Sequence, residues 1–281
     1  MARIKITCDS TADLSPELYE KYDIDTVPLY IILDNETYKD SVDIQPDDIF
    51  AFVDQTGKLP KTAAGSIQDY TELFNRYANE FDAVIHFNIG EKFSSSHQNA
   101  YIASQNFENV YVVNSDNLST GTGHQVLDAV QWAEEGLAPE EIVKRINSNK
   151  AKYETSFVID TLEYLRKGGR CTPLQAIGAN LLSIKPTIEV INGEMDVGKK
   201  YRGKLNKVLQ KYVSDRLEGR DDIKTDRIFI THSGCSEETI NIVKDTILQY
   251  QTFDEMIVTR ASCTITCHCG PNTLGILFRT K

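Results

Sequence analysis

Three consecutive serines, Ser94, Ser95 and Ser96, occupy a position where their hydroxyls could bind a ligand. They follow an apolar run over residues 83–87, which predicts a buried strand of a parallel sheet, and they precede a run over residues 98–104 that predicts a helix. A helix start offers unpaired N–H groups and a partial positive charge, and open α/β sheets place ligand sites at such turns. One serine is enough to cap the helix, so the remaining hydroxyls indicate an anion site.

Four further residues at predicted loop positions could join these serines, namely Asp9, Thr62, Arg170 and His268. Thr62 lies too early to cap the helix that follows it, a role that falls to Ser66. Hydroxyls, an imidazole and a guanidinium are together suited to a carboxylate or a phosphate. Alone, Asp9 is more simply interpreted as a turn residue and His268 as a structural residue of a loop.

A hydrolase is the enzymatic alternative for the same residues. Ser94 would be the nucleophile, His268 the base and Asp9 the orienting group, an arrangement that depends on a geometry the sequence does not supply. There is no G-x-S-x-G elbow. Nucleotide binding is not supported either, because neither G-x-G-x-x-G after a strand nor a P-loop pattern occurs.

The six cysteines do not predict a metal or a disulfide framework. The chain is long and lacks a secretory leader pattern, so reduced thiols are expected. Cys263, Cys267, His268 and Cys269 match no usual zinc spacing, and adjacent residues converge poorly on one tetrahedral ion. We therefore expect no metal and no cofactor.

Composition predicts a globular chain of 281 residues, since 41% of them are hydrophobic. A formal net charge of −11 disfavours nucleic acid and anionic membrane surfaces as partners. No apolar run approaches membrane-spanning length, so no integral membrane association is expected. These features predict a soluble, cytoplasmic protein, and a monomer is the default oligomeric state.

The order of predicted elements indicates two α/β lobes, over residues 1–152 and 153–281. Strands alternate with helices up to about residue 150, which predicts a parallel sheet covered on both faces. Residues 26–33 read as one strand near an edge because of Pro28. The second lobe is predicted to be mixed, with a hairpin at Asn192-Gly193 and a buried helix over residues 173–182. A ligand tunnel would lie between or beside the lobes.

Six motifs in register resemble the DegV family. Residues 9–13, Asp-Ser-Thr-Ala-Asp, match that family's D-S-T-A-D-L opening. Thr62 falls on the threonine of its T-S-Q-P-S loop, and Ser94 falls on the serine of its L-S-G-T-Y-Q-S-A segment. Residues 160–170 are the closest match, and residues 184–186 and 268–271 follow in the family's order. The resemblance covers nearly the whole chain.

The resemblance implies a two-lobe protein that binds one long-chain fatty acid, such as palmitate or oleate, in a buried tunnel, for lipid transport or fatty acid metabolism. It implies that Thr62 and Ser94 hydrogen-bond the carboxylate with His268 beside it, and that Asp9 and Ser95 are neighbours of the ligand. In bacterial fatty acid kinase a separate subunit supplies ATP and phosphorylates the bound carboxylate, and Arg170 would serve docking or phosphoryl transfer there. The chain itself would then be a binding protein and not an enzyme.

Several departures from the family's motifs fall at the predicted head-group site. Ser95 replaces a glycine, Asn272 replaces the second glycine of G-P-G, and Cys269 replaces a usual threonine; the loop after Thr62 reads Ala-Ala-Gly-Ser. The head-group site would be reshaped by these changes. Two alternatives therefore stay open, an acyl-processing enzyme that uses Ser94 and a binder of a small phosphorylated metabolite.

Overall fold

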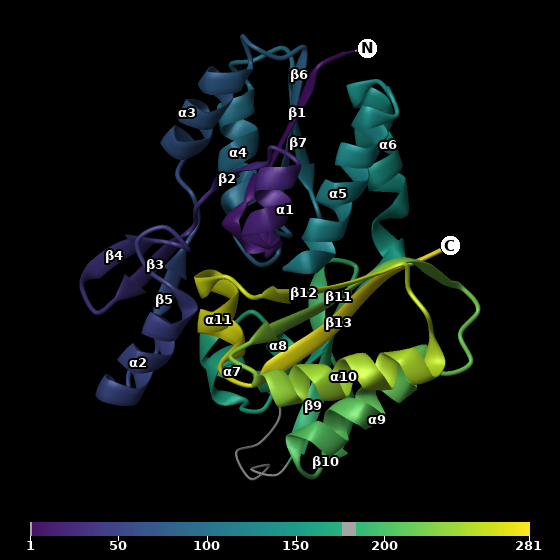
Figure 1. The fold of residues 1–281 in the computed structure, drawn as a ribbon. Helices are drawn as coiled ribbons and strands as arrows, with labels where there is room; N and C mark the ends of the chain where they lie inside the picture. The colour runs from purple at the N-terminus through teal and green to yellow at the C-terminus, as the bar shows by residue number, and fades with distance from the viewer. Residues whose placement is uncertain (1, 176–183) are drawn as a thin grey trace.

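The alternating first part of the chain folds into a parallel sheet (Figure 1). The computed structural model describes residues 2–175 and 184–281. The strands of this sheet are β1 (Ile4–Asp9), β2 (Asp25–Val27), β6 (Ala83–Asn88) and β7 (Val110–Asn114). They lie in the order β2-β1-β6-β7, and every pairing is parallel. All six residues of β6 are buried, as expected for a strand that is covered on both faces.

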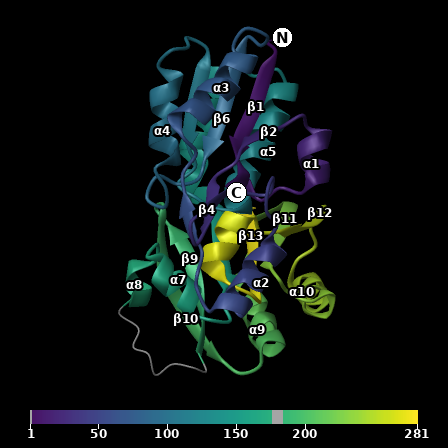
Figure 2. The ribbon, with the colours of Figure 1, turned by 90° about the vertical axis from the view of Figure 1, so that its left-hand side faces the viewer.

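Helices cover both faces of this parallel sheet. Its helices are α1 (Pro16–Lys21), α3 (Ile67–Tyr77), α4 (Ser96–Ser104), α5 (Thr120–Glu134) and α6 (Pro139–Asn149), with the 3-10 turns η1 (Ser10–Ala12) and η2 (Lys150–Lys152). The α3/α4 pair lies on one side of the strands and α5 on the other (Figure 2), with α6 packed beside α5 (Figure 1). As predicted, Ser66 caps α3, and its hydroxyl accepts from the N–H of Asp69.

The prediction of a single strand over residues 26–33 was wrong. The chain leaves the parallel sheet after Val27, and Pro28, which has no N–H, cannot continue the ladder. A new strand starts at Tyr30 in a separate antiparallel sheet of order β4-β3-β5. This small sheet contains β3 (Tyr30–Leu33), β4 (Glu36–Lys39) and β5 (Lys61–Ala63), and α2 (Pro46–Thr56) lies between β4 and β5 in sequence. Thr62, predicted in a loop, is therefore the central residue of β5.

The rest of the chain forms a mixed sheet of six strands in the order β10-β9-β8-β13-β11-β12. Its strands are β8 (Tyr153–Val158), β9 (Ile184–Ile191), β10 (Glu194–Arg202), β11 (Ile223–Ser233), β12 (Glu255–Arg260) and β13 (Thr273–Thr280). The predicted hairpin is confirmed, since Asn192 and Gly193 take the positive φ angles of 52° and 76° that such a turn requires.

Two helical layers enclose the mixed sheet (Figure 1). The helices are α7 (Glu163–Gly168), α8 (Thr172–Gln175), α9 (Leu205–Leu217), α10 (Glu237–Tyr250) and α11 (Cys263–Cys269). The α9/α10 pair covers one face, and α5 from the first lobe lies against the other through β8 and β13. The predicted helix over residues 173–182 falls, from residue 176 on, outside the described residues.

The boundary predicted at residue 153 coincides with the start of β8. The parallel sheet uses strands before that point and the six-stranded sheet uses strands after it. The small sheet and α2 come from the first part of the chain but contact α11 of the second. The division into lobes 1–152 and 153–281 therefore stays a prediction.

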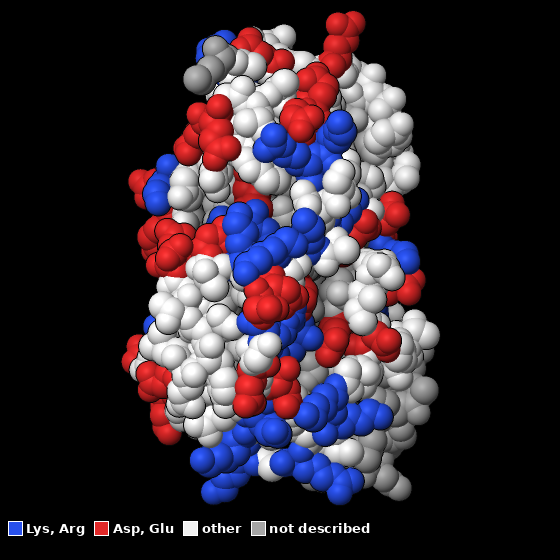
Figure 3. Space-filling model, turned by 90° about the vertical axis from the view of Figure 1, so that its right-hand side faces the viewer, with Lys and Arg blue, Asp and Glu red and all other residues white. Residues whose placement is uncertain are grey.

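Charge is distributed unevenly over the surface. Figure 3 shows acidic and basic side chains intermixed over most of one face, with Lys and Arg gathered at its lower end. Exposed basic residues of β10, α9 and their connection occur at that end of the molecule, namely Lys199, Lys200, Arg202, Lys204, Lys207 and Lys211. The net charge of −11 is thus an average over the chain, and the argument it gives against anionic partners does not hold locally there. Within the described ranges, no helix has the length and apolar character needed to cross a bilayer.

Candidate ligand-binding cavity

A cavity of about 280 Å³ lies where β5, the turn before α4, the end of α7 and α11 meet. Five of the six predicted site residues line it: Thr62, Ser94, Ser95, Arg170 and His268. Thr62 and His268 are far apart in the sequence, and the packing of α11 against β5 brings them together. The sixth, Asp9, does not line the cavity.

His268 lies on a helix and not in the predicted loop. The start of α11 is held by acceptors from distant parts of the chain, because Asp13 accepts from the N–H of Ser262 at 3.0 Å and Asp40 accepts from Cys263 at 2.8 Å and Thr264 at 3.2 Å. Both carboxyl groups are buried. Carboxylates at the positive end of a helix stabilise it, and here they fix the helix that carries His268.

The His268 ring hydrogen-bonds Thr62 across the cavity. The distance from His268 Nε2 to Thr62 Oγ1 is 2.9 Å. Burial, together with the nearby charge of Arg170, lowers the pKa of His268 to about 4, so the ring is neutral at pH 7. A Cβ on residue 168 would lie 2.4 Å from His268 Nδ1, so only glycine at Gly168 leaves room for the ring.

The serine turn precedes α4 as predicted, but the hydroxyls are used differently. Ser95 is the N-cap residue by position, yet its side chain makes no capping hydrogen bond. The Oγ of Ser94 instead accepts from the N–H of Ser96 at 3.2 Å and lies 2.9 Å from Ser96 Oγ. Ser96 is fully buried, whereas Ser94 is half-buried and faces the cavity.

Asp9 lies buried beneath this turn. Its carboxylate accepts from the hydroxyl of Tyr70 at 2.8 Å, from the amide of Asn88 at 3.0 Å and from the N–H of Ile89 at 3.0 Å. It lies 3.5 Å from His86 Nε2. Asp9 does not line the cavity, so its role as a neighbour of the ligand stays a prediction.

Arg170 is exposed at the rim of the cavity. Its guanidinium donates to the carbonyl of Gly168 at 2.6 Å, and its Nε lies 3.5 Å from the carbonyl of Phe93. These bonds to backbone carbonyls leave the positive charge without an ion-pair partner among the described residues. Arg170 therefore supplies positive potential at the opening.

Thr264 is a lining residue that the sequence analysis missed. It is 4% exposed, and its Oγ1 has no hydrogen-bond partner among the residues described. Residues four apart lie on the same face of a helix, so Thr264 is one turn from His268 on α11. The four-residue spacing of Thr264 and His268 would have predicted that both face the cavity, but only if residues 263–269 had been predicted to be helical.

The remaining wall of the cavity is apolar. Its lining includes Leu29, Ile89, Phe93, Leu118, Met195 and Ile265. Several of these residues belong to one buried hydrophobic cluster that continues toward Phe157 and Ile188 of the mixed sheet. A second, inner cavity of about 20 Å³, room for about one water molecule, shares Leu118, Ile265 and Cys269 with the first. The polar groups thus stand at one end of an apolar path into the core.

The hydrolase alternative finds no support in the hydrogen bonds of these residues. Ser94 bonds to Ser96, His268 bonds to Thr62, and Asp9 bonds to Tyr70, Asn88 and Ile89. None of the three bonds to another of them within the described part of the chain. Over the same residues, no three His, Cys, Asp or Glu side chains are grouped so that they could hold a metal ion.

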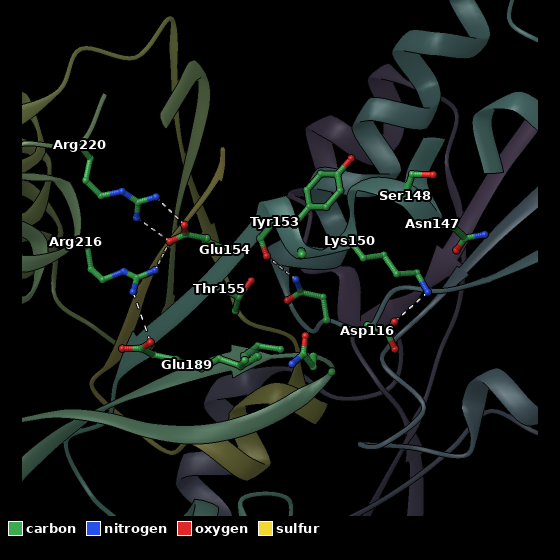
Figure 4. Close-up of a pocket in the computed structure, with 16 residues that line it drawn as sticks. Asp116, Asn147, Ser148, Lys150, Tyr153, Glu154, Thr155, Glu189, Arg216 and Arg220 are labelled. Carbon is green, nitrogen blue, oxygen red and sulfur yellow. Dashed lines mark hydrogen bonds and ion pairs between the residues drawn. The ribbon is translucent and has the colours of Figure 1, made fainter. Parts of the chain in front are cut away.

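A larger groove of about 700 Å³ lies elsewhere, between the end of α6 and the strands β8 and β9 of the mixed sheet (Figure 4). Its charged side chains pair with one another. Arg216 and Arg220 bind Glu154 at 2.5 and 2.7 Å, and Lys150 binds Asp116 at 3.0 Å. The charges of these side chains are therefore already paired, and none of the predicted site residues lines the groove. The smaller cavity is therefore the candidate functional site.

Comparison with known proteins decides the family. The family model described as "Uncharacterised protein, DegV family" matches residues 3–281. The chain belongs to the DegV family. A DegV domain-containing protein of Caldanaerobacter subterraneus is 31% identical over 284 residues, which cover 100% of both chains. The resemblance found in the sequence motifs is thus confirmed.

Solved DegV structures confirm the predicted α/β fold as well. A fatty-acid-binding DegV family protein of Thermus thermophilus is 29% identical, with 99% of this chain and 100% of that chain covered and a TM-score of 0.90. A stearic acid-binding protein of Eubacterium ventriosum is 26% identical, with 98% of both chains covered and a TM-score of 0.85. The likeness to the Thermus protein thus covers 99% of this chain.

Proposed function

We propose that the protein binds a long-chain fatty acid, with the carboxylate at Thr62, Ser94 and His268 and the tail in the apolar path behind them. The observation that carries the proposal is the pairing of two cavity-facing hydroxyls with an apolar wall that leads into the core. The fatty-acid binding of the Thermus and Eubacterium proteins supports it.

The two ends of the cavity suit the two ends of such a ligand. Each buried methylene contributes about 0.8 kcal/mol, so the tail supplies most of the affinity. The carboxylate must then be satisfied by hydrogen bonds, because an unpaired buried charge is very costly. Thr62, Ser94 and Thr264 offer hydroxyls for this, and the neutral His268 ring hydrogen-bonds Thr62.

The tail also requires movement of side chains. The inner cavity, at about 20 Å³, is too small for a chain of methylenes. Leu118, Ile265 and Cys269 separate it from the outer cavity. Displacing these side chains would join the two spaces into one tunnel.

Removal of the Ser94 hydroxyl tests the head-group assignment. Ser94→Ala is expected to weaken palmitate binding by about tenfold, because a hydrogen bond to a charged group contributes roughly 1.5–3 kcal/mol. Ser95→Ala, which removes a neighbouring hydroxyl that makes no capping bond, is the matched control and is expected to change the affinity less than threefold. The measurement is displacement of a fluorescent fatty acid, after native mass spectrometry of the freshly purified protein has shown what it carries.

Two results would contradict the proposal. A protein that is empty when purified and takes up neither palmitate nor oleate would favour a small phosphorylated metabolite at the same groups. Hydrolysis of acyl esters that disappears in Ser94→Ala would instead favour the acyl-processing enzyme. Monomeric state and a cytoplasmic location stay predictions, and the free cysteines of the described residues fit a reducing compartment.

We extend the proposal to presentation of the carboxylate to a separate kinase subunit. Arg170 stands exposed at the opening and has no acidic partner among the described residues, so its charge is available to an incoming phosphate group. Arg170→Ala is expected to keep palmitate affinity within about threefold but to lose phosphorylation of the bound fatty acid by a kinase partner. Lys167→Ala, which removes a nearby exposed charge that pairs with Glu163, serves as the control. Equal phosphorylation of both variants would remove Arg170 from this role.

A further inference from the structure

The inner cavity and the large groove meet at one residue, Thr155. Among the described residues, Thr155 alone lines both the inner cavity of about 20 Å³ and the groove of about 700 Å³. The inner cavity in turn shares Leu118, Ile265 and Cys269 with the outer cavity. The outer cavity, the inner cavity and the groove therefore lie in series, with two walls between them. A fatty acid tail that passes the first wall next meets Thr155.

Thr155 lies at the point where β8 and β9 of the mixed sheet separate. The two strands pair over residues 156–158 and 187–189. Beyond these pairs β9 continues beside β10, and the groove opens between its last residues and the start of β8 (Figure 4). Side chains alternate between the faces of a strand, so Thr155 is on the same side of β8 as Phe157, which lines the inner cavity.

The Thr155 side chain closes this wall by its volume and not by a hydrogen bond. Thr155 is 2% exposed, and its Oγ1 has no hydrogen-bond partner among the described residues. A Cβ on Gly121 of α5 would lie 2.2 Å from that oxygen, so the helix leaves the side chain little room to turn aside. The amide of Asn117 donates to the carbonyl of Tyr153 at 3.0 Å and holds the start of α5 against β8.

We propose that Thr155 is the end stop of the acyl tunnel and sets the longest fatty acid whose tail is wholly buried. This inference rests on the proposed function and deepens it. Beyond Thr155 the tail would enter the groove, where Glu154 and the arginines that pair with it are partly exposed to water. Methylenes add affinity only where they leave water, so the carbons past Thr155 contribute little.

The test is the dependence of affinity on chain length, measured with the saturated acids from decanoate to docosanoate in two-carbon steps. For the wild-type protein we expect the affinity to rise with length and then to stop rising. Thr155→Ala enlarges the inner cavity by a hydroxyl and a methyl group. Its affinity should go on rising for one further step, by about threefold to fifteenfold, because each buried methylene contributes about fourfold. Thr155→Leu adds volume at the same place and should end the rise at least one step earlier.

The controls separate the volume at this wall from other effects. Thr155→Val keeps the shape of the side chain and removes a hydroxyl that has no described partner, so it should keep the wild-type limit. Thr187→Ala truncates another buried threonine, one on β9 that within the described residues lines none of the three cavities. It should also keep the limit, since a general loss of packing weakens the binding of every acid and does not change the length at which the rise ends.

Displacement of a fluorescent fatty acid from the delipidated protein measures all of these affinities. The inference is overturned if Thr155→Ala has the wild-type limit, or if the wild-type affinity rises throughout the series. If Thr155→Ala does not fold, an unchanged limit in Thr155→Leu overturns it instead. A wild-type protein that binds no acid of the series would overturn the proposed function, so the two failures are distinguishable.

Discussion

Ile265→Phe is expected to abolish tight binding of a sixteen-carbon fatty acid while it leaves the binding of an eight-carbon acid nearly unchanged. Ile265 lines both the outer cavity and the inner one, and it is 8% exposed. The inner cavity is about 20 Å³, so the added volume of a phenyl ring closes the passage at this point. A tail that must pass Ile265 would then leave its far half without a buried site.

The size of this effect follows from the number of methylenes left in water. About eight of them, at about 0.8 kcal/mol each, correspond to roughly 6 kcal/mol. Even if part of the tail finds another path, we expect the affinity for palmitate to fall more than about a hundredfold. Octanoate places only its head group and first carbons in the outer cavity, and its affinity should change by less than about threefold.

The control for this prediction is Ile265→Leu, which conserves volume and should bind both acids normally. Affinities come from displacement of a fluorescent fatty acid, with thermal unfolding of each variant as a check on the fold. Tight palmitate binding by a well-folded Ile265→Phe would show that the tail takes a different route through the hydrophobic cluster. The head-group assignment would be untouched by that result.

Local patterns in the sequence predict those features that local interactions determine. The Asn192-Gly193 turn and the Ser66 cap are both found where they were predicted, because each depends on a few neighbouring residues. The parallel sheet was also predictable, since alternating strands and helices have few ways to pack. The break at Pro28 was not, because the destination of β3 depends on pairing with β4 and β5 and not on its own residues.

In the candidate site, too, the features set by neighbouring residues were predictable and those set by distant contacts were not. Local patterns placed Ser94 at a turn, but its proximity to Thr62 and His268 came from the family resemblance, which carries information about distant contacts. The helix α11 was missed because its residues are poor helix formers and its start is held by Asp13 and Asp40, more than 220 positions away in sequence. Thr264 was missed as a consequence.

Asp128→Ala is expected to lower the free energy of unfolding by about 3–5 kcal/mol. Asp128 lies on α5 and is 1% exposed. It pairs with Arg279 of β13 and with Arg227 of β11, the latter at 3.3 Å, and it accepts from the hydroxyl of Tyr153 at 2.8 Å. These bonds connect a helix of the first lobe to the sheet of the second.

Asp128→Ala is destabilising because it leaves two buried guanidinium groups without the carboxylate that they bind. Arg227 and Arg279 are 9% and 8% exposed, so neither is well solvated. In the variant Arg279 would still be paired with Asp226. The other acidic group near Arg227 is Glu255, whose carboxylate lies 4.0 Å from the guanidinium. Removing one partner of a buried ion pair costs about 3–5 kcal/mol, because the remaining charge is left buried without compensation.

Urea unfolding, followed by both fluorescence and circular dichroism, measures this loss. The matched control is Asp222→Ala, which also removes a carboxylate paired with an arginine, but one that is 52% exposed. Exposed pairs contribute about 0–1 kcal/mol, so the control should unfold near the wild-type midpoint. A loss below about 1 kcal/mol in Asp128→Ala would mean that Arg227 and Arg279 find water or other acceptors when Asp128 is absent. The contact between the two lobes would then depend on the apolar packing of α5 against β8 and β13, and the ion pairs would contribute specificity of docking without net stability.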